Sequence, residues 1–565
     1  MKRAIRFLTV FLTVCLLMTS LSSCFLAERL LRAIVCVTCE TESSADPTIE
    51  QTNDPVEPVA EDLVYDLSDE DLTCFEDLLD ALEKLILTDR SADEDAIDAV
   101  NGEMEDQYYH IVTQAQLAYI YYCMDESDAE LSDAYLYASD MVSVALEKYQ
   151  AVCLKIDESD APGREYFFSD WTEEDLEEMR GFSTEMTDLQ RANDELLVQY
   201  RSLTEAEYHD QTGVLYLQMV ANRNRIAVLN EYDSYQEYAY QKVYDRDYTP
   251  EQAQAMYGYV AEYLVPLCEI ASQRFSSAYS QLNFSDQRNI SALFDDDYFP
   301  IKRLIDGYLA TYPDDVRDGM SSLFEPQNQF TTTAKTAHEG AFTVFLYDPG
   351  RPVSYFGPGY RSGYTILHEM GHFYSAVRNG SDEIPMDHAE TQSQGNEWIF
   401  TAYLMENIGR KNFADAVFYY ELYVSIAGVI AECIIDAFES DIYRDPPTDA
   451  RELDDRMTAV CEQFGGKDYL SRNVVDPDAY WRGVVLESPC YYISYAFSSM
   501  VSLSVFCEAM LDYSKGQDAY LTLMGVIPEG MTYTEWLDVL DIPSPFEEEL
   551  YRRIADLARD EKIAA

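Results

Sequence analysis

Positive charge is scarce in this chain. Its 565 residues include only 39 Lys and Arg against 104 Asp and Glu, which gives a formal net charge of −65. A surface this acidic repels phosphate backbones, which argues against nucleic acid as a partner. It also repels anionic lipid headgroups, so attachment to a membrane requires an anchor. The hydrophobic share of 47% is ordinary and argues against a largely disordered chain.

A disulfide framework and internal repeats are also missing. The twelve Cys are scattered over a long chain, whereas scaffolds that depend on disulfides are short. Cys36 and Cys39 form the only close pair, and no second pair completes a four-cysteine zinc site. Residues 65–565 contain no repeat of 20–50 residues and no long linker. These absences favour one large folded body.

The N-terminus has the layout of a secretory signal peptide. Three basic residues precede an apolar run over residues 7–18, which is too short for a comfortable membrane span. The sequence Leu-Ser-Ser-Cys, ending at Cys24, resembles the lipobox of bacterial lipoproteins. We therefore expect residues 1–23 to be a lipoprotein signal peptide and residues 24–63 to be an acylated N-terminus and flexible acidic linker. An ordinary secreted protein is the alternative.

The body is predicted to be mostly α-helical. From Leu67 onward the apolar residues recur with a period near 3.6. Residues 342–347 are β-branched and aromatic and end at an Asp-Pro-Gly turn, so they are the best strand candidate. We divide the body into an N-terminal helical lobe (64–330) and a C-terminal lobe (331–565). The expected helices span 95–125, 130–156, 172–202, 204–244 and 250–281, and helices resume from about 363.

Histidine is scarce as well, yet two of the six His share one motif. The sequence His-Glu-Met-Gly-His places His368 and His372 one turn apart on one helix face, where both can bind a single ion. Ser362 can cap this helix and Gly380 can end it. Zinc favours imidazole nitrogen, and Glu369 is the candidate general base for a zinc-bound water. With so few His, the motif is expected by chance on the order of 0.01 times.

A catalytic zinc needs a third protein ligand and keeps its fourth position open. Glu390 and Glu397 are seven residues apart and therefore share a helix face. We predict Glu397, 25 residues after His372, to be the third ligand. Glu390 is then predicted to orient a zinc-bound imidazole through a hydrogen bond. Spacing alone leaves open the alternative that both are solvated carboxylates.

These two segments together resemble the thimet oligopeptidase and oligoendopeptidase F family of zinc metallopeptidases. The family's third ligand lies in a Glu-x-x-Ser-Gln-x-x-Glu segment, which matches Glu390, Ser393, Gln394 and Glu397. This chain has Gln392 where the family usually has Pro. The resemblance implies a large helical zincin-type fold with a deep substrate channel and one Zn²⁺ per chain.

The resemblance also implies a role for a tyrosine segment. Family members use a Tyr-Tyr-x-Tyr segment to stabilise the negative charge that builds on the substrate carbonyl oxygen. We assign this role to Tyr495 first and to Tyr492 second, in a helix expected to start at Ser488. Ordinary packing is the alternative, because the chain has 45 Tyr.

Two further features follow from the resemblance. Gly340, Ala341 and Phe342 resemble the start of the edge strand that lines the family's substrate channel. Many family members carry a His shortly before the tyrosine segment, which this chain lacks; His338 or His388 could substitute. Residues 244–249 resemble another family segment.

Together these features predict an extracytoplasmic, lipid-anchored zinc metalloendopeptidase that hydrolyses short unfolded oligopeptides. One alternative is an enzyme similar to a dipeptidyl carboxypeptidase, and another is a non-catalytic lipoprotein that binds peptides. The intact Glu369 argues against the second, because a binding protein has no use for a general base. The physiological peptide, the side-chain preference and the oligomeric state stay open.

Overall fold

The structure is a computed structural model of the full chain. It describes residues 63–559 apart from 89–93, 170, 174–175, 177–178, 181–183, 296 and 382–383. The expected signal peptide, the acylation site at Cys24, and the linker up to residue 62 lie outside the described residues.

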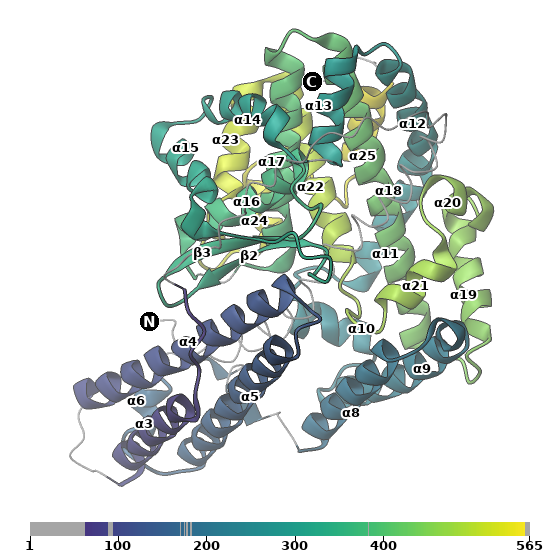
Figure 1. The fold of residues 1–565 in the computed structure, drawn as a ribbon. Coiled ribbons are helices and arrows are strands. Elements are labelled where there is room, and N and C mark those ends of the chain that lie inside the picture. The colour runs from purple at the N-terminus through teal and green to yellow at the C-terminus, as the bar shows by residue number, and fades with distance from the viewer. Residues whose placement is uncertain are drawn as a thin grey trace. The chain divides into compact units, whose positions relative to one another are not determined.

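The chain divides into two compact units, which are described separately (Figure 1). Unit 1 contains the described parts of Asp54–Thr184 together with Ser322–Pro358. Unit 2 contains the described parts of Glu185–Ser321 and Gly359–Ala565. The expected boundary at residue 330 therefore differs from the structure. The strands share a core with the N-terminal helices, whereas residues 185–321 belong with the metal-motif helices.

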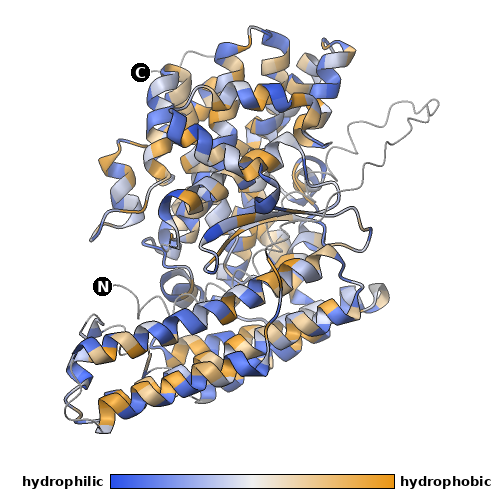
Figure 2. Cartoon of the chain, turned by 60° about the vertical axis from the view of Figure 1, so that its left-hand side comes forward, coloured by the Kyte–Doolittle hydropathy of each residue, from blue (hydrophilic) through white to orange (hydrophobic). Residues whose placement is uncertain are grey.

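Three long helices dominate unit 1: α3 (Asp69–Thr88), α4 (Glu94–Met124) and α5 (Ala129–Asp157). They pack against one another through the apolar faces that the helical period predicted, and Figure 2 shows hydrophobic and hydrophilic residues alternating along them. Asp128 caps α5 by accepting from the backbone amide of Glu130 at 2.8 Å. The short helix α6 (Arg164–Phe167) follows.

A three-stranded sheet completes unit 1, with the order β1-β3-β2. β2 (Ala341–Leu346) and β3 (Arg351–Phe356) form an antiparallel hairpin in which Val344 pairs with Val353. β1 (Gln329–Thr331) runs parallel to β3. The predicted strand at 342–347 is confirmed as β2, whereas β1 and β3 were not foreseen. One face of the sheet packs on the C-terminal half of α4.

Five helices form the centre of unit 2: α12 (Val265–Tyr279), α16 (Gly363–Asn379), α17 (Met386–Asn407), α18 (Lys411–Arg444) and α22 (Ile493–Leu511). α17 packs on both α16 and α22, while α18 packs on α12, α17 and α22. Within the described chain, α22 alone is long and apolar enough to cross a membrane by length and composition. However, 89% of that stretch is buried inside the protein, as expected for a core helix.

The remaining helical elements of unit 2 lie before and after the metal motif in the sequence. Before the metal motif they are α8 (Thr184–Arg201), α9 (Glu205–Leu229), α10 (Tyr235–Tyr238), η1 (Ala239–Val243), α11 (Pro250–Tyr259), η2 (Val260–Leu264), α13 (Phe284–Phe294), η3 (Phe299–Ile301), α14 (Lys302–Leu309) and α15 (Asp314–Ser321). After it they are α19 (Glu452–Cys461), η6 (Glu462–Phe464), α20 (Lys467–Asn473), α21 (Pro477–Val484), α23 (Tyr513–Leu523), α24 (Tyr533–Val539) and α25 (Glu548–Ala558). Unit 1 also contains η4 (Ser322–Phe324) and η5 (Pro326–Asn328). The expected fold class, mostly helical with a small β element, is confirmed.

Candidate metal centre

The helix that carries the histidine motif begins and ends where the sequence predicts. Ser362 is the N-cap of α16, and its Oγ accepts from the backbone amide of Thr365 at 3.3 Å. Gly380 is the C-cap and has φ +66°, a left-handed conformation that favours glycine. The motif therefore lies in the middle of a well-defined helix.

Gly371, inside the motif, allows α17 to approach α16 closely. A Cβ at this position would lie 2.5 Å from the carbonyl oxygen of Gln392 and 2.6 Å from the Cα of Ser393, both on α17. Nearby, the Asn396 side-chain amide donates to the carbonyl of Leu367 at 2.7 Å. The two contacts show that α17 runs antiparallel to α16, with its early residues opposite the later part of the motif.

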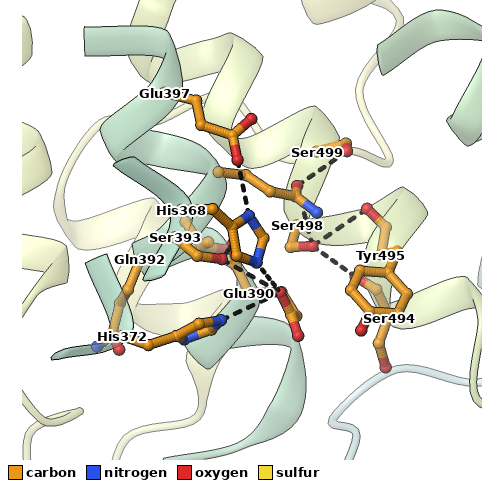
Figure 3. A network of polar contacts seen from close by, with 12 residues as sticks. His368, His372, Glu390, Gln392, Ser393, Glu397, Ser494, Tyr495, Ser498 and Ser499 are labelled. Carbon is orange, nitrogen blue, oxygen red and sulfur yellow. Dashed lines mark hydrogen bonds and ion pairs between the residues drawn. The ribbon is translucent and has the colours of Figure 1, made fainter. Parts of the chain in front are cut away.

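Two imidazoles and one carboxylate converge between these helices (Figure 3). The Nε2 atoms of His368 and His372 each lie 3.6 Å from Oε2 of Glu390. One possible ligand atom from each residue falls within 4.8 Å of the others. Around a tetrahedral zinc with bonds near 2.0–2.1 Å, ligand atoms are about 3.3 Å apart. The spacing and the chemistry of the donor atoms therefore fit one zinc ion.

In the structure Glu390 takes the position predicted for Glu397, and Glu397 takes the position predicted for Glu390. Glu390, not Glu397, is the carboxylate opposite both Nε2 atoms. Glu397 lies two turns further along α17 and contacts the other ring nitrogen of His368, with 2.7 Å between Nδ1 and Oε1. The cause is the antiparallel register of the two helices. Only six residues separate them, so the first turns of α17 lie beside His372.

The contact with Glu397 fixes the orientation of the His368 ring. A carboxylate can only accept, so Nδ1 carries the proton and donates it to Glu397, which leaves Nε2 directed toward Glu390. Such carboxylate–histidine pairs are the usual support of a metal-ligating imidazole. Glu390 is supported in turn by Ser393, whose hydroxyl donates to Oε2 at 3.1 Å.

The charges of the site support one another. Burial alone would lower the pKa of His372, but the hydrogen bond and charge of Glu390 outweigh it and raise the pKa. Burial tends to raise the pKa of Glu390, yet the two neighbouring histidines hold it below its ordinary value. Burial, followed by the charge of Glu397, raises the pKa of Glu421 on α18 well above its usual range, which favours the neutral form of this neighbouring carboxyl.

Glu369, the predicted general base, is 2% exposed on α16. Its negative charge contributes to the raised pKa of His372. The structure thus keeps a buried carboxylate beside the histidine pair. Its part in proton transfer remains a prediction.

The tyrosine segment precedes α22 rather than starting a helix at Ser488. Cys490 has φ +57°, which a continuing helix does not allow, and regular helix begins at Ile493. Tyr492 occupies the N-cap position and Tyr495 lies in the first turn. Tyr491, a member of the same segment to which the sequence assigned no role, donates its hydroxyl hydrogen to the hydroxyl of Tyr495 at 3.0 Å.

Contacts between α17 and α22 place Tyr495 near the metal group, in the region drawn in Figure 3. Gln394 Oε1 on α17 accepts from the Ser499 hydroxyl on α22 at 2.8 Å. At the start of both helices, the Ser494 hydroxyl donates to Asp387, whose pKa is raised by burial in spite of this hydrogen bond and the charge of Arg246. Along α22, Tyr495 lies between Ser494 and Ser499. Along α17, Glu390 lies between their partners Asp387 and Gln394. The structure therefore brings the two predicted parts of the site together.

Other predicted residues are placed differently. His388 is fully buried, its Nε2–H donates to the carbonyl of Leu523 at 2.5 Å, and its ring stacks on Tyr533, so it is a packing residue. Burial lowers the pKa of His388 to about 4. His338, by contrast, lies in unit 1, where Nδ1 is 3.0 Å from Glu126.

The predicted substrate-binding strand also lies in unit 1. Ala341 and Phe342 open the outer strand β2, and their side chains are buried, with the Phe342 ring against Tyr355. Gly340 precedes the strand, and its carbonyl accepts from the backbone amide of Gly357 at 2.8 Å. The side chains of Ala341 and Phe342 therefore belong to the core, and peptide binding by this strand stays a prediction.

Comparison with solved structures gives the fold relatives of the chain. PZ peptidase A, solved with an inhibitor, superposes with a TM-score of 0.66 at 15% identity over 88% of this chain and 99% of that one. A protein from Bacillus anthracis str. Ames described as an oligoendopeptidase F gives 0.65 at 15% identity, over 89% and 97%. Oligoendopeptidase-F from Enterococcus faecium gives 0.51 at 12%, over 87% and 96%. No family model and no curated protein matches the sequence. The chain therefore has the fold of the oligoendopeptidase F and PZ peptidase structures.

Proposed function

We propose that this protein is a zinc-dependent peptidase that hydrolyses short unfolded oligopeptides. The observation that carries the proposal is the group formed by His368, His372 and Glu390, in which a carboxylate oxygen lies 3.6 Å from each of two imidazole Nε2 atoms. Three such ligands with an open fourth position are typical of a catalytic zinc site. The fold relatives, which are peptidases by name, support the same activity.

The three ligands would hold one zinc ion, and Glu397 would keep the His368 ring in the orientation that presents Nε2. When bound, zinc polarises the scissile carbonyl and lowers the pKa of a water molecule. The buried Glu369 is proposed to accept the proton of the attacking water and to deliver it to the leaving amine. Tyr495, with Tyr492 as the second candidate, would donate a hydrogen bond to the developing oxyanion.

Tyr491 would support this donor. Because its hydroxyl donates to the Tyr495 oxygen, the Tyr495 proton can point away from Tyr491. An oriented donor stabilises negative charge at little reorganisation cost, which is the basis of oxyanion stabilisation. The pair is thus suited to peptide hydrolysis rather than to peptide binding alone.

We also propose that the enzyme acts outside the cytoplasm, anchored by a lipid on Cys24. The proposal rests on the lipobox-like sequence before Cys24 and on the apolar run at 7–18. Mass spectrometry of the membrane fraction tests it: a diacylglycerol on Cys24 supports an anchor, and an unmodified mature N-terminus elsewhere contradicts it.

The activity is tested with a quenched fluorescent peptide and the purified full chain. Cleavage should stop when a chelator removes the metal and return when one equivalent of zinc is added. The products of a single octapeptide, identified by mass spectrometry, separate an endopeptidase from an enzyme that removes C-terminal dipeptides. No cleavage by a zinc-loaded, folded chain would contradict the proposal and favour a peptide-binding lipoprotein.

A further inference from the structure

Arg246 is a fully buried arginine in unit 2, with its side chain 0% exposed. It follows η1, and its guanidinium carbon lies 4.5 Å from the ring centroid of Tyr240 and 4.5 Å from that of Tyr244. A buried charge is costly unless its environment compensates for lost solvation. The partners of this guanidinium therefore indicate why the charge is kept inside.

Three hydrogen bonds connect Arg246 to the tyrosine segment. Nη1 donates to the carbonyl of Cys490 at 2.8 Å, and Nη2 donates to the carbonyl of Tyr491 at 3.1 Å and to Oγ of Ser494 at 2.7 Å. The acceptors are the residues immediately before Tyr492 and Tyr495. A planar guanidinium holds several acceptors in a fixed geometry, which a lysine ammonium does not do.

The same side chain also contacts the helix that carries the third metal ligand. Its Nε lies 3.7 Å from Oδ1 of Asp387, whose side chain is 6% exposed. Asp387 precedes Glu390 by three residues, so both lie on one face of α17. One guanidinium therefore links the carboxylate helix to the segment that presents the tyrosines.

The tyrosine segment depends on such contacts for its conformation. Cys490 has φ +57°, a conformation that is unfavourable for residues other than glycine. Its amide donates to Glu439 Oε2 at 2.9 Å, and the preceding carbonyl, that of Pro489, accepts from Tyr244 at 2.7 Å. Buried side chains thus hold the backbone on both sides of the bend.

We propose that Arg246 is a positioning residue that fixes Tyr491 and Tyr495 relative to Glu390. This inference rests on the proposed peptidase function. Arg246 acts through the segment it binds and through Asp387, while the tyrosine hydroxyls act on the substrate. Loss of the guanidinium shifts the oxyanion donor and leaves the metal ligands in place.

Hydrogen exchange measures this positioning without any catalytic activity. In R246K the ammonium keeps the charge beside Asp387, but its single nitrogen cannot reproduce the fixed spacing of Nη1 and Nη2 toward the three acceptors. Amides of residues 490–495 should therefore exchange faster than in the wild type. Ser494→Ala removes one of the three bonds and should show a smaller increase at the same residues. Peptides from α16 should be unchanged in both variants. Unchanged exchange over 490–495 in both variants would overturn the proposal.

A double-mutant cycle tests whether Arg246 acts through Tyr495. Displacement of a catalytic group by about 1 Å costs about 100-fold in rate, so R246K should lower kcat by up to about 100-fold with KM and zinc content nearly unchanged. In a Tyr495→Phe background the same change should lower kcat by less than about 5-fold, because the donor is already absent.

The matched control is Arg223, a second buried arginine that donates to the carbonyl of Leu486 at 2.7 Å and lies outside the Asp387 contact. R223K should lower the melting temperature as R246K does, without the dependence on Tyr495. Equal effects of R246K in both backgrounds would overturn the proposal. A wild-type chain that loads zinc and cleaves no peptide would contradict the peptidase function instead, and the exchange experiment would still decide the positioning.

Discussion

The exchange of roles between Glu390 and Glu397 gives the sharpest prediction. Glu390→Gln keeps the shape of the side chain and removes the anionic ligand from both imidazoles. Glu397→Gln keeps a carbonyl oxygen that can still accept from Nδ1 of His368, 2.7 Å away in the wild type. Loss of an outer partner of a metal-bound histidine costs about 10–100-fold in metal affinity, or about 1.4–2.7 kcal/mol. The loss of zinc affinity should exceed that range in Glu390→Gln and should stay within it in Glu397→Gln.

Glu421→Gln is the matched control, because this carboxyl is buried beside Glu397 on α18 and its pKa is raised well above the ordinary value by burial and by the charge of Glu397. Its amide replacement should change zinc affinity little. Zinc titration in competition with a chromophoric chelator, with metal content per chain as a second readout, measures all three variants. A larger loss of affinity in Glu397→Gln than in Glu390→Gln would refute the assignment of Glu390 as the third ligand.

Four further predictions address the base, the oxyanion donor, the helix packing and the buried histidine. Glu369→Gln should keep zinc and lose about 10²–10⁴-fold in kcat, measured with the quenched peptide; full activity would exclude its role as base. Tyr495→Phe should lower kcat by about 10²–10³-fold with little change in KM in steady-state kinetics, and an unchanged kcat would make the tyrosine a packing residue. Gly371→Ala should lower the free energy of unfolding by about 1–3 kcal/mol, because the new methyl meets the α17 backbone at 2.5 Å. Gly258→Ala on α11, where nothing lies within 4 Å, should instead stabilise by about 0.5–1 kcal/mol; equal urea midpoints for the two variants would contradict the packing argument. Finally, burial lowers the pKa of His388 to about 4 from 6.5, so the unfolded chain binds a proton that the folded chain excludes. The titration of His388 therefore leaves the free energy of unfolding at its full value above pH 6.5 and decreases it as the pH falls, by about 2 kcal/mol between pH 7 and pH 5. Urea unfolding of His388→Asn should lack this decrease, and an identical pH dependence in both proteins would contradict it.

The sequence predicted the local features of the site well, because these depend on residues close together in the chain. The spacing of His368 and His372 on one helix and the ends of that helix at Ser362 and Gly380 follow from local rules. The strand at 342–347 has the composition and the closing turn that strands require. The same rules place Glu390 and Glu397 on one face of the next helix.

The choice between those two carboxylates could not be made locally. It depends on how far α17 slides along α16, and that register is set by the contact of Gly371 with the α17 backbone and by the short connection between the helices. Counting residues from His372 ignores this register. The shortness of the connection between α16 and α17 favours Glu390, because it lies nearer to this connection than Glu397 does.

The spacing of residues likewise could not predict the contacts of Arg246 with the tyrosine segment. It is separated from Cys490 by 244 positions and reaches it only through tertiary packing. Residues 244–249 were noted for their resemblance to a family segment, and the charged residue inside that segment was the available signal. The division into units was missed for the same reason, since the strands pack on helices more than 200 residues earlier.

Anomalous X-ray scattering at the zinc absorption edge, from crystals of the zinc-loaded chain, locates the metal and identifies its ligands. We expect one strong peak per chain, bonded to Nε2 of His368, to Nε2 of His372 and to a carboxylate oxygen of Glu390, with Glu397 against Nδ1 of His368. A peak bonded to Glu397 in place of Glu390, or no peak at the two histidines, would contradict this expectation.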